Sequence, residues 1–144
     1  MRSMPSLGGQ NPEYFIVAMR AYQDGVRTHA TMRDVAKSYA DRDLKNFAAY
    51  YAESAAPPAA SGMPAPEAAT RCAACHGAAG RDTVTPDVPR LAGQKAPYIE
   101  QVLREYRSGE RKHAVMQAQA AQLADAEIAA LAAYYASQAG VFVK

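Results

Sequence analysis

The chain carries one stretch of sequence twice, 84 positions apart, and this repeat constrains its fold more than any other feature. Residues 5–10 correspond to residues 89–94 without a gap, and the match continues to the Ala-Ala-Tyr-Tyr-Ala segments that end at Ala52 and Ala136. Roughly two in five positions are identical over about fifty residues, which is strong internal similarity. Two copies are too few for a solenoid, so we expect a duplicated domain.

A second feature, the sequence C-x-x-C-H at Cys72, Cys75 and His76, carries the chemistry. In this motif two thiols on one helical turn form thioethers with the vinyl groups of a haem, and the adjoining histidine binds the iron. A bare C-x-x-C also fits a redox dithiol, half of a zinc site or a disulfide. A zinc site needs more ligands than these two cysteines, and a thioredoxin-like dithiol needs a βαβ setting that no strand-like alternation supports. The motif therefore predicts covalently attached haem c.

The composition favours helices and excludes two classes of interaction. Hydrophobic residues make up 49% of the 144 positions, many of them alanine, and tryptophan is absent. Such sequence, with few β-branched residues, favours α-helix. The formal net charge of +2 is too small to indicate a surface that binds nucleic acid, and no apolar run approaches the length of a membrane span. We therefore expect an all-α protein with no nucleic-acid partner and no transmembrane segment.

The first copy of the repeat lacks a haem-attachment motif. Shifting Cys72 back by 84 positions places its counterpart before Met1. Haem is attached to C-x-x-C-H outside the cytoplasm, yet residues 1–5 have no apolar region of the kind that an export signal needs. A missing upstream segment explains both observations and is the interpretation we favour. The alternative is a first domain that has lost its haem.

Three parts are expected along the chain. Residues 1–54 form a partial domain without its C-x-x-C-H segment, residues 55–66 a linker rich in Pro and Ala, and residues 67–144 a complete mono-haem domain. In the complete copy we expect helices over 67–74, 97–107 and 126–138, and a short helical piece that carries Met116. Gly109 is the expected C-cap of the second helix and Asp125 the expected N-cap of the last. The last helix should bury Ile128, Leu131 and Tyr135.

Together, these motifs resemble a class I cytochrome c and, because of the duplication, the di-haem cytochrome c4 family. The resemblance lies in the C-x-x-C-H motif, a Pro-x-Leu-x-Gly loop, a ligand methionine and a terminal helix rich in Ala and Tyr. The matching positions of the second half are Pro89, Leu91, Gly93, Gln94, Tyr98, Tyr106, Gly109, Arg111, Met116, Leu123, Asp125, Glu127, Ile128, Leu131, Tyr134 and Tyr135. It implies a class I cytochrome c fold, with one complete domain after a partial duplicate.

The sixth iron ligand has one leading candidate. Met116 lies between the Gly109 turn and the terminal helix and matches Met32 of the first copy, whereas Met63 has no counterpart. A thioether is a soft neutral donor that raises the potential of a His/Met haem. Met32 is a ligand only if an upstream segment supplies a first haem, and is otherwise a core methionine. His113 is the competing ligand, although an exposed or propionate-bonding histidine explains it better.

The resemblance implies roles for six further residues. The Pro89 carbonyl accepts a hydrogen bond from His76 Nδ1 and orients the imidazole. Leu91 packs on the haem face, and Tyr98 and Arg111 bond the propionates, as do Tyr106 and Gln94. A plain loop proline, core tyrosines and a solvated arginine are the competing explanations.

The function expected from these features is single-electron transfer with no substrate transformed. By resemblance, electrons pass in the periplasm from a quinol-oxidising complex or a dehydrogenase to a terminal oxidase. A variant makes the chain the cytochrome subunit of a larger dehydrogenase complex. A haem peroxidase would need an open distal position, and the sequence offers no distal acid–base pair beyond His113. A zinc-binding or purely structural module is the remaining alternative.

Overall fold

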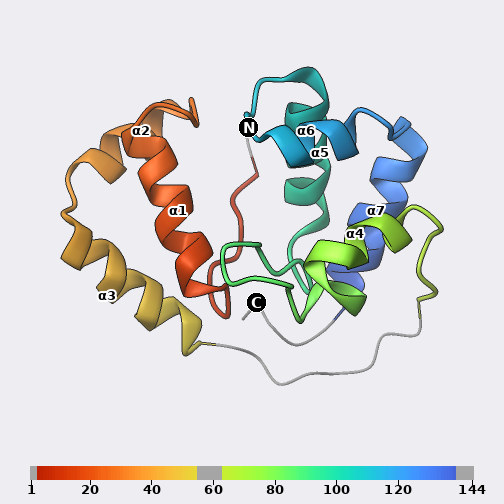
Figure 1. The fold of residues 1–144 in the computed structure, drawn as a ribbon, viewed down its shortest axis with the longest axis horizontal. Helices are drawn as coiled ribbons and strands as arrows, with labels where there is room; N and C mark the ends of the chain where they lie inside the picture. The colour runs from red at the N-terminus through yellow and green to blue at the C-terminus, as the bar shows by residue number, and fades with distance from the viewer. Residues whose placement is uncertain (1–2, 55–62, 139–144) are drawn as a thin grey trace.

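The computed structural model describes residues 3–54 and 63–138, and all regular structure in these two ranges is helical. The first half contains three helices and the second half four, with a 3₁₀ turn after the first of them (Figure 1). Their bounds are α1 Pro12–Gln23, α2 Ala30–Lys37, α3 Asp41–Ala52, α4 Ala69–His76, η1 Ala78–Gly80, α5 Ala96–Ser108, α6 Ala114–Ala120 and α7 Asp125–Ser137. The expected all-α class is confirmed.

The sequence repeat is a structural repeat. Helices α1, α2 and α3 recur as α5, α6 and α7 at the same offset of 84 positions, to within one residue at their ends. In Figure 1 the two sets lie on opposite sides of the molecule, with the chain between residues 3 and 11 running between them. Helix α4, which carries the C-x-x-C-H motif, belongs to the second half alone in the described part of the chain.

The helix ends follow local signals, with one correction. Gly109 has φ 84° and caps α5, as expected, because a left-handed residue ends a helix at little cost when it has no Cβ. The prediction that Asp125 is the N-cap of the last helix was wrong: α7 begins at Asp125, and Ala124 is the N-cap. The Glu127 carboxylate accepts the Ala124 N–H at 2.8 Å, which satisfies this end without a polar cap residue. Helix α4 starts later than expected and extends through His76.

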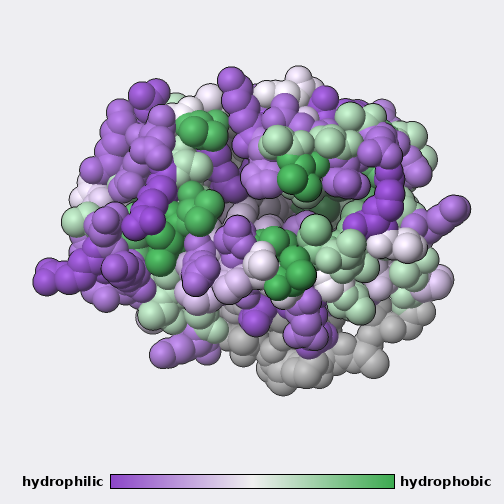
Figure 2. Space-filling view, viewed as in Figure 1, coloured by the Kyte–Doolittle hydropathy of each residue, from purple (hydrophilic) through white to green (hydrophobic). Residues whose placement is uncertain are grey.

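Each half has its own hydrophobic core. Ile128, Leu131 and Tyr135 are buried in the second half, as the spacing predicted. In the first half Leu44 is fully buried against α1, and Phe47 and Tyr51 pack at the margin of the same cluster. Hydrophobic residues also appear at the surface over both halves (Figure 2). The partial copy thus builds a core without a counterpart of α4 in its described residues.

The junction between the halves is polar and nearly symmetric. The side-chain amide of Gln10 pairs with the main chain of Arg90, accepting from its N–H at 2.8 Å and donating to its carbonyl at 3.2 Å. The amide of Gln94 pairs in the same way with the main chain of Ser6, at 2.8 and 3.0 Å. Ser6 and Arg90 are themselves 84 positions apart, as are Gln10 and Gln94. The two halves are therefore joined about a pseudo-twofold axis.

The division into parts at residues 54 and 66 stays a prediction. Most of the proposed linker lies outside the described residues, and of it only residues 63–66 are seen, as non-helical chain before α4. Within the described ranges, none of the helices combines the length and the apolar character that crossing a bilayer requires.

Candidate haem site

The two cysteines lie one turn apart near the end of α4. Cys72 is half-buried against the second core and Cys75 is exposed, and both thiols are free. Residues three apart share a helix face, so both sulfurs can reach one group. Burial raises the pKa of the Cys72 thiol, which favours its neutral form in the absence of a bound group. An exposed Cys75 places one edge of any attached group at the molecular surface.

His76 is buried, with 6% of its surface exposed, and its ring orientation is fixed. Its Nδ1 lies 2.8 Å from the Pro89 carbonyl oxygen. A carbonyl only accepts, so Nδ1 carries the proton and the lone pair of Nε2 is left for a metal. Burial lowers the pKa of His76, and the hydrogen bond to Pro89 opposes that shift. The expected partnership of His76 and Pro89 is present.

Two glycines turn the chain so that Pro89 reaches His76. Gly77 has φ 78° and ends α4, and a Cβ on it would lie 2.2 Å from the Asp82 carbonyl oxygen. Gly80 has φ 73°, and its Cβ would lie 2.8 Å from Leu91 Cβ and 2.9 Å from the Tyr135 ring. The Gly80 carbonyl accepts the Leu91 N–H at 2.8 Å. Leu91 thus packs on the second core directly beneath this turn.

Met116 comes from the other end of the second half. It is half-buried on α6, which packs on α5. Figure 1 shows α6 and α4 at opposite ends of this half, with α5 and α7 running between them. His76 and Met116 therefore belong to helices at opposite ends of the second half (Figure 1). His113 is exposed at the N-cap of α6.

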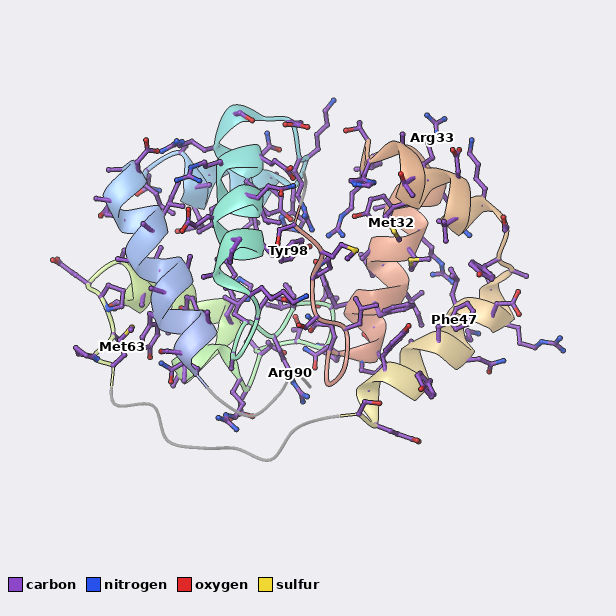
Figure 3. All side chains as sticks on the ribbon, turned by 180° about the vertical axis from the view of Figure 1, so that it is seen from behind. Met32, Arg33, Phe47, Met63, Arg90 and Tyr98 are labelled. Carbon is purple, nitrogen blue, oxygen red and sulfur yellow. The ribbon has the colours of Figure 1, made fainter. Side chains whose placement is uncertain are left out.

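Tyr98 and Arg111 meet at the junction, together with two residues of the first half. Arg111 donates to the hydroxyls of Tyr98 and Tyr14, both at 3.4 Å, and Arg27 donates to Tyr14 at 2.9 Å. Burial by itself raises the pKa of Tyr14, but the two guanidiniums outweigh it and hold the pKa below its usual value. Tyr98, Arg111 and Arg27 line a cavity of about 190 Å³ that Met32 also lines. In Figure 3, Tyr98 and Met32 lie on either side of the junction.

The residues fit a haem with two propionates. Arg111 is 8% exposed, its Nε is buried without a hydrogen-bond partner, and no carboxylate pairs with Arg111 or Arg27 in the described residues. Buried charges are costly when unpaired, so the Arg111 guanidinium favours a nearby anion. The neutral, oriented His76 and the two free thiols one turn before it complete the donor set. The chemistry of this donor set fits haem c.

Comparison with known proteins decides the family. The model of the cytochrome c family matches residues 64–139. Cytochrome c4 of Pseudomonas aeruginosa is 32% identical over 155 residues, which cover 92% of this chain and 74% of that protein. The chain belongs to the cytochrome c family. This cytochrome binds haem c and transfers electrons.

Two solved structures extend the likeness across both halves of the cytochrome. Cytochrome c4 of Acidithiobacillus ferrooxidans superimposes with a TM-score of 0.78 at 27% identity and covers 93% of this chain and 88% of its own. Thiosulfate dehydrogenase of Marichromatium purpuratum superimposes with a TM-score of 0.76 at 30% identity, covering 92% of this chain but 32% of its own. The expected class I cytochrome c fold with a duplicated domain is confirmed.

Several expectations about single residues change. Gln94, expected at the propionates, instead bonds Ser6 across the junction. Within residues 3–54 and 63–138, no three His, Cys, Asp or Glu side chains are grouped so that they could hold a metal ion. Sequence reasoning assigned no role to Tyr14 and Arg27. The repeat contained the signal, because they are the counterparts of Tyr98 and Arg111.

Proposed function

We propose that this cytochrome carries single electrons in the periplasm through one haem c attached at Cys72 and Cys75 and ligated by His76 and Met116. Bound haem supplies one-electron Fe(III)/Fe(II) chemistry. The observation that carries the proposal is the 2.8 Å contact between His76 Nδ1 and the Pro89 carbonyl, which keeps the ring proton on Nδ1 and leaves the Nε2 lone pair available to iron. With Met116 as the second protein ligand, the iron would have no open position for a substrate.

The other residues of the site are proposed to hold the haem in place and to leave one edge of it at the molecular surface. Arg111 would neutralise a propionate, Tyr98 would donate a hydrogen bond to it, and Leu91 would pack against the haem face. The exposed Cys75 thioether lies at the surface, where electrons enter and leave. Met32 is a ligand only where an upstream segment brings a second haem to the first half.

The partners we propose are redox proteins: a quinol-oxidising complex or a dehydrogenase as donor and a terminal oxidase as acceptor. The likeness to about one third of a thiosulfate dehydrogenase chain supports a second arrangement, in which the cytochrome is the electron-transfer subunit of a larger dehydrogenase complex. Size-exclusion chromatography of the protein from its native source separates the two arrangements, because a stable subunit elutes with its dehydrogenase and a free carrier elutes alone.

Optical spectroscopy of the purified holoprotein tests the ligand set. A His/Met haem gives ferric protein the weak long-wavelength band of sulfur bound to iron, and Met116→Ala should abolish it. Met63→Ala is the matched control and should retain the band, because Met63 is exposed ahead of α4. A high-spin ferric spectrum in the wild type that shifts with peroxide would instead support a peroxidase. Absence of haem from the alkaline pyridine assay would contradict attachment altogether.

A further inference from the structure

The imidazole of His113 caps the helix that carries Met116. The Met116 N–H donates to His113 Nδ1 at 3.3 Å, which satisfies one of the free N–H groups at the start of α6. The first half repeats the arrangement, with the Met32 N–H donating to His29 Nδ1 at 3.3 Å. In both halves the capped residue is the methionine at the ligand position of the repeat.

The second half adds a return bond that the first half lacks. The His113 N–H donates to the side-chain oxygen of Gln117 at 3.1 Å, so the cap residue and the helix hold each other. The equivalent position in the first half is Arg33, whose guanidinium has no acceptor atom. The two-way cap is thus confined to the half with the complete haem motif.

The ring of His113 is also fixed from the side. It lies edge-on to Tyr106, with ring centroids 6.4 Å apart, and Tyr106 is buried on α5. Because Nδ1 accepts a hydrogen bond, the ring proton is on Nε2, and neither nitrogen offers a lone pair to iron. This geometry makes His113 poorly suited to bind iron and well suited to cap the start of α6.

We propose that His113 and Gln117 form a two-way cap that holds the main chain at Met116 and so keeps its sulfur on the iron. His113 is a positioning residue. The proposal rests on Met116 being the ligand, as put forward above. Helix α6 has only seven residues, and helices this short are marginal by themselves, so its first turn depends on the cap.

Competition by an added ligand measures how firmly the sulfur is held. Added imidazole binds the ferric iron by displacing the thioether. Its apparent affinity therefore reports the fraction of protein in which Met116 is dissociated from the iron. His113→Ala should raise imidazole affinity by roughly threefold to tenfold, the range expected for loss of an N-cap. His113→Asn should restore the wild-type value, since Asn caps as well as any residue. Gln117→Ala should give a smaller increase of the same sign.

His29→Ala is the matched control because it removes the same kind of cap from α2. It should leave imidazole affinity and the sulfur–iron band unchanged. The cap proposal is overturned if His113→Ala binds imidazole as the wild type does while Met116→Ala binds it far more tightly. It is also overturned if His113→Asn fails to recover a change seen in His113→Ala. If wild type and Met116→Ala share one spectrum, the ligand assignment itself has failed, and the cap proposal fails with it.

Discussion

At the scale of the residue, His76 shows how a main-chain group decides what a side chain can do. One carbonyl, from Pro89, fixes the tautomer and the tilt of the imidazole. The carbonyl is in reach because Gly77 and Gly80 both adopt left-handed conformations between α4 and the Pro89 loop. The orientation of the imidazole is thus set by three residues that act through their main chain.

Covalent attachment depends on the two thiols of α4. Replacing both Cys72 and Cys75 with Ser removes the sulfur that forms each thioether, so the haem should be released by acid–acetone extraction. The single Cys75→Ser variant keeps the half-buried Cys72 and should retain the haem on one bond. Haem retained by the double variant after extraction would contradict thioether attachment.

Acid should weaken one surface contact of the second half. The Arg107 guanidinium, 2.6 Å from Asp125, lowers the pKa of that carboxyl through a hydrogen bond and its charge. A carboxyl with a depressed folded pKa contributes stability above its unfolded pKa of about 3.9 and loses it as the pH falls through the folded value. Asp125→Asn should therefore be slightly less stable than the wild type to urea at neutral pH and equal to it in strong acid.

The matched control for Asp125 is its counterpart Asp41, which lies 3.5 Å from Arg20. Both pairs are exposed, and exposed pairs contribute little, so Asp41→Asn should cost less than Asp125→Asn at the longer distance. A difference between wild type and Asp125→Asn that persists unchanged in strong acid would rule out an ionic origin.

At the scale of the element, the turn after α4 is the most tightly packed. Gly80→Ala forces a Cβ to within 2.8 Å of Leu91 and 2.9 Å of Tyr135, in addition to strain at positive φ. The strain costs about 1–2 kcal/mol and the overlap about 1–3 kcal/mol more in free energy of unfolding. Denaturant unfolding of the holoprotein measures the sum.

Gly109→Ala isolates the strain, because its φ is also positive but its nearest side-chain atom lies 3.8 Å from the new Cβ. Its loss should be the strain alone, about 1–2 kcal/mol. Equal losses in the two variants would show that Leu91 and Tyr135 yield to the new methyl group.

The helices were largely predictable from local sequence, and the reasons are visible in particular residues. Gly109 ends α5 and the spacing of Ile128, Leu131 and Tyr135 sets the buried face of α7, because each signal acts within a few residues. The N-cap of α7 was mistaken because Glu127, inside the helix, does the capping.

The contacts across the junction could not be predicted. Gln94 has the same neighbours in sequence whether it bonds a propionate or the main chain of Ser6. That choice depends on how two domains meet, and no local pattern encodes the angle between them. The bond between Arg111 and Tyr14, 97 positions apart, depends on the same angle.

At the scale of the whole molecule, two separate cores are joined by partly buried hydrogen bonds. Gln94→Ala removes both bonds to Ser6 and leaves main-chain groups unpaired, which should cost about 1–3 kcal/mol. Gln10→Ala should cost a similar amount by its bonds to Arg90. Calorimetry of the double variant should show two transitions where the wild type shows one, because each half keeps its own core.

Gln122→Ala is the control, since Gln122 is exposed and outside the junction. It should change the free energy of unfolding by less than about 0.5 kcal/mol. A single sharp transition in the double variant would show that other contacts, such as the pair of Asn11 and Val88, suffice to join the halves.

The two glutamine clamps differ in what they demand of their partners. Each glutamine side chain hydrogen-bonds only the main-chain N–H and C=O groups of its partner, and every residue except proline has both groups. The residue bonded by a glutamine can therefore have any side chain in this respect. Gln94 bonds the main chain of Ser6, which has a short hydroxyl side chain, and Gln10 bonds the main chain of Arg90, which has a long cationic one. Exchange of Ser6 should therefore leave its bonds to Gln94 intact, whereas Arg90 also donates from its guanidinium to the Gly9 carbonyl at 3.0 Å and so holds the junction by its side chain as well.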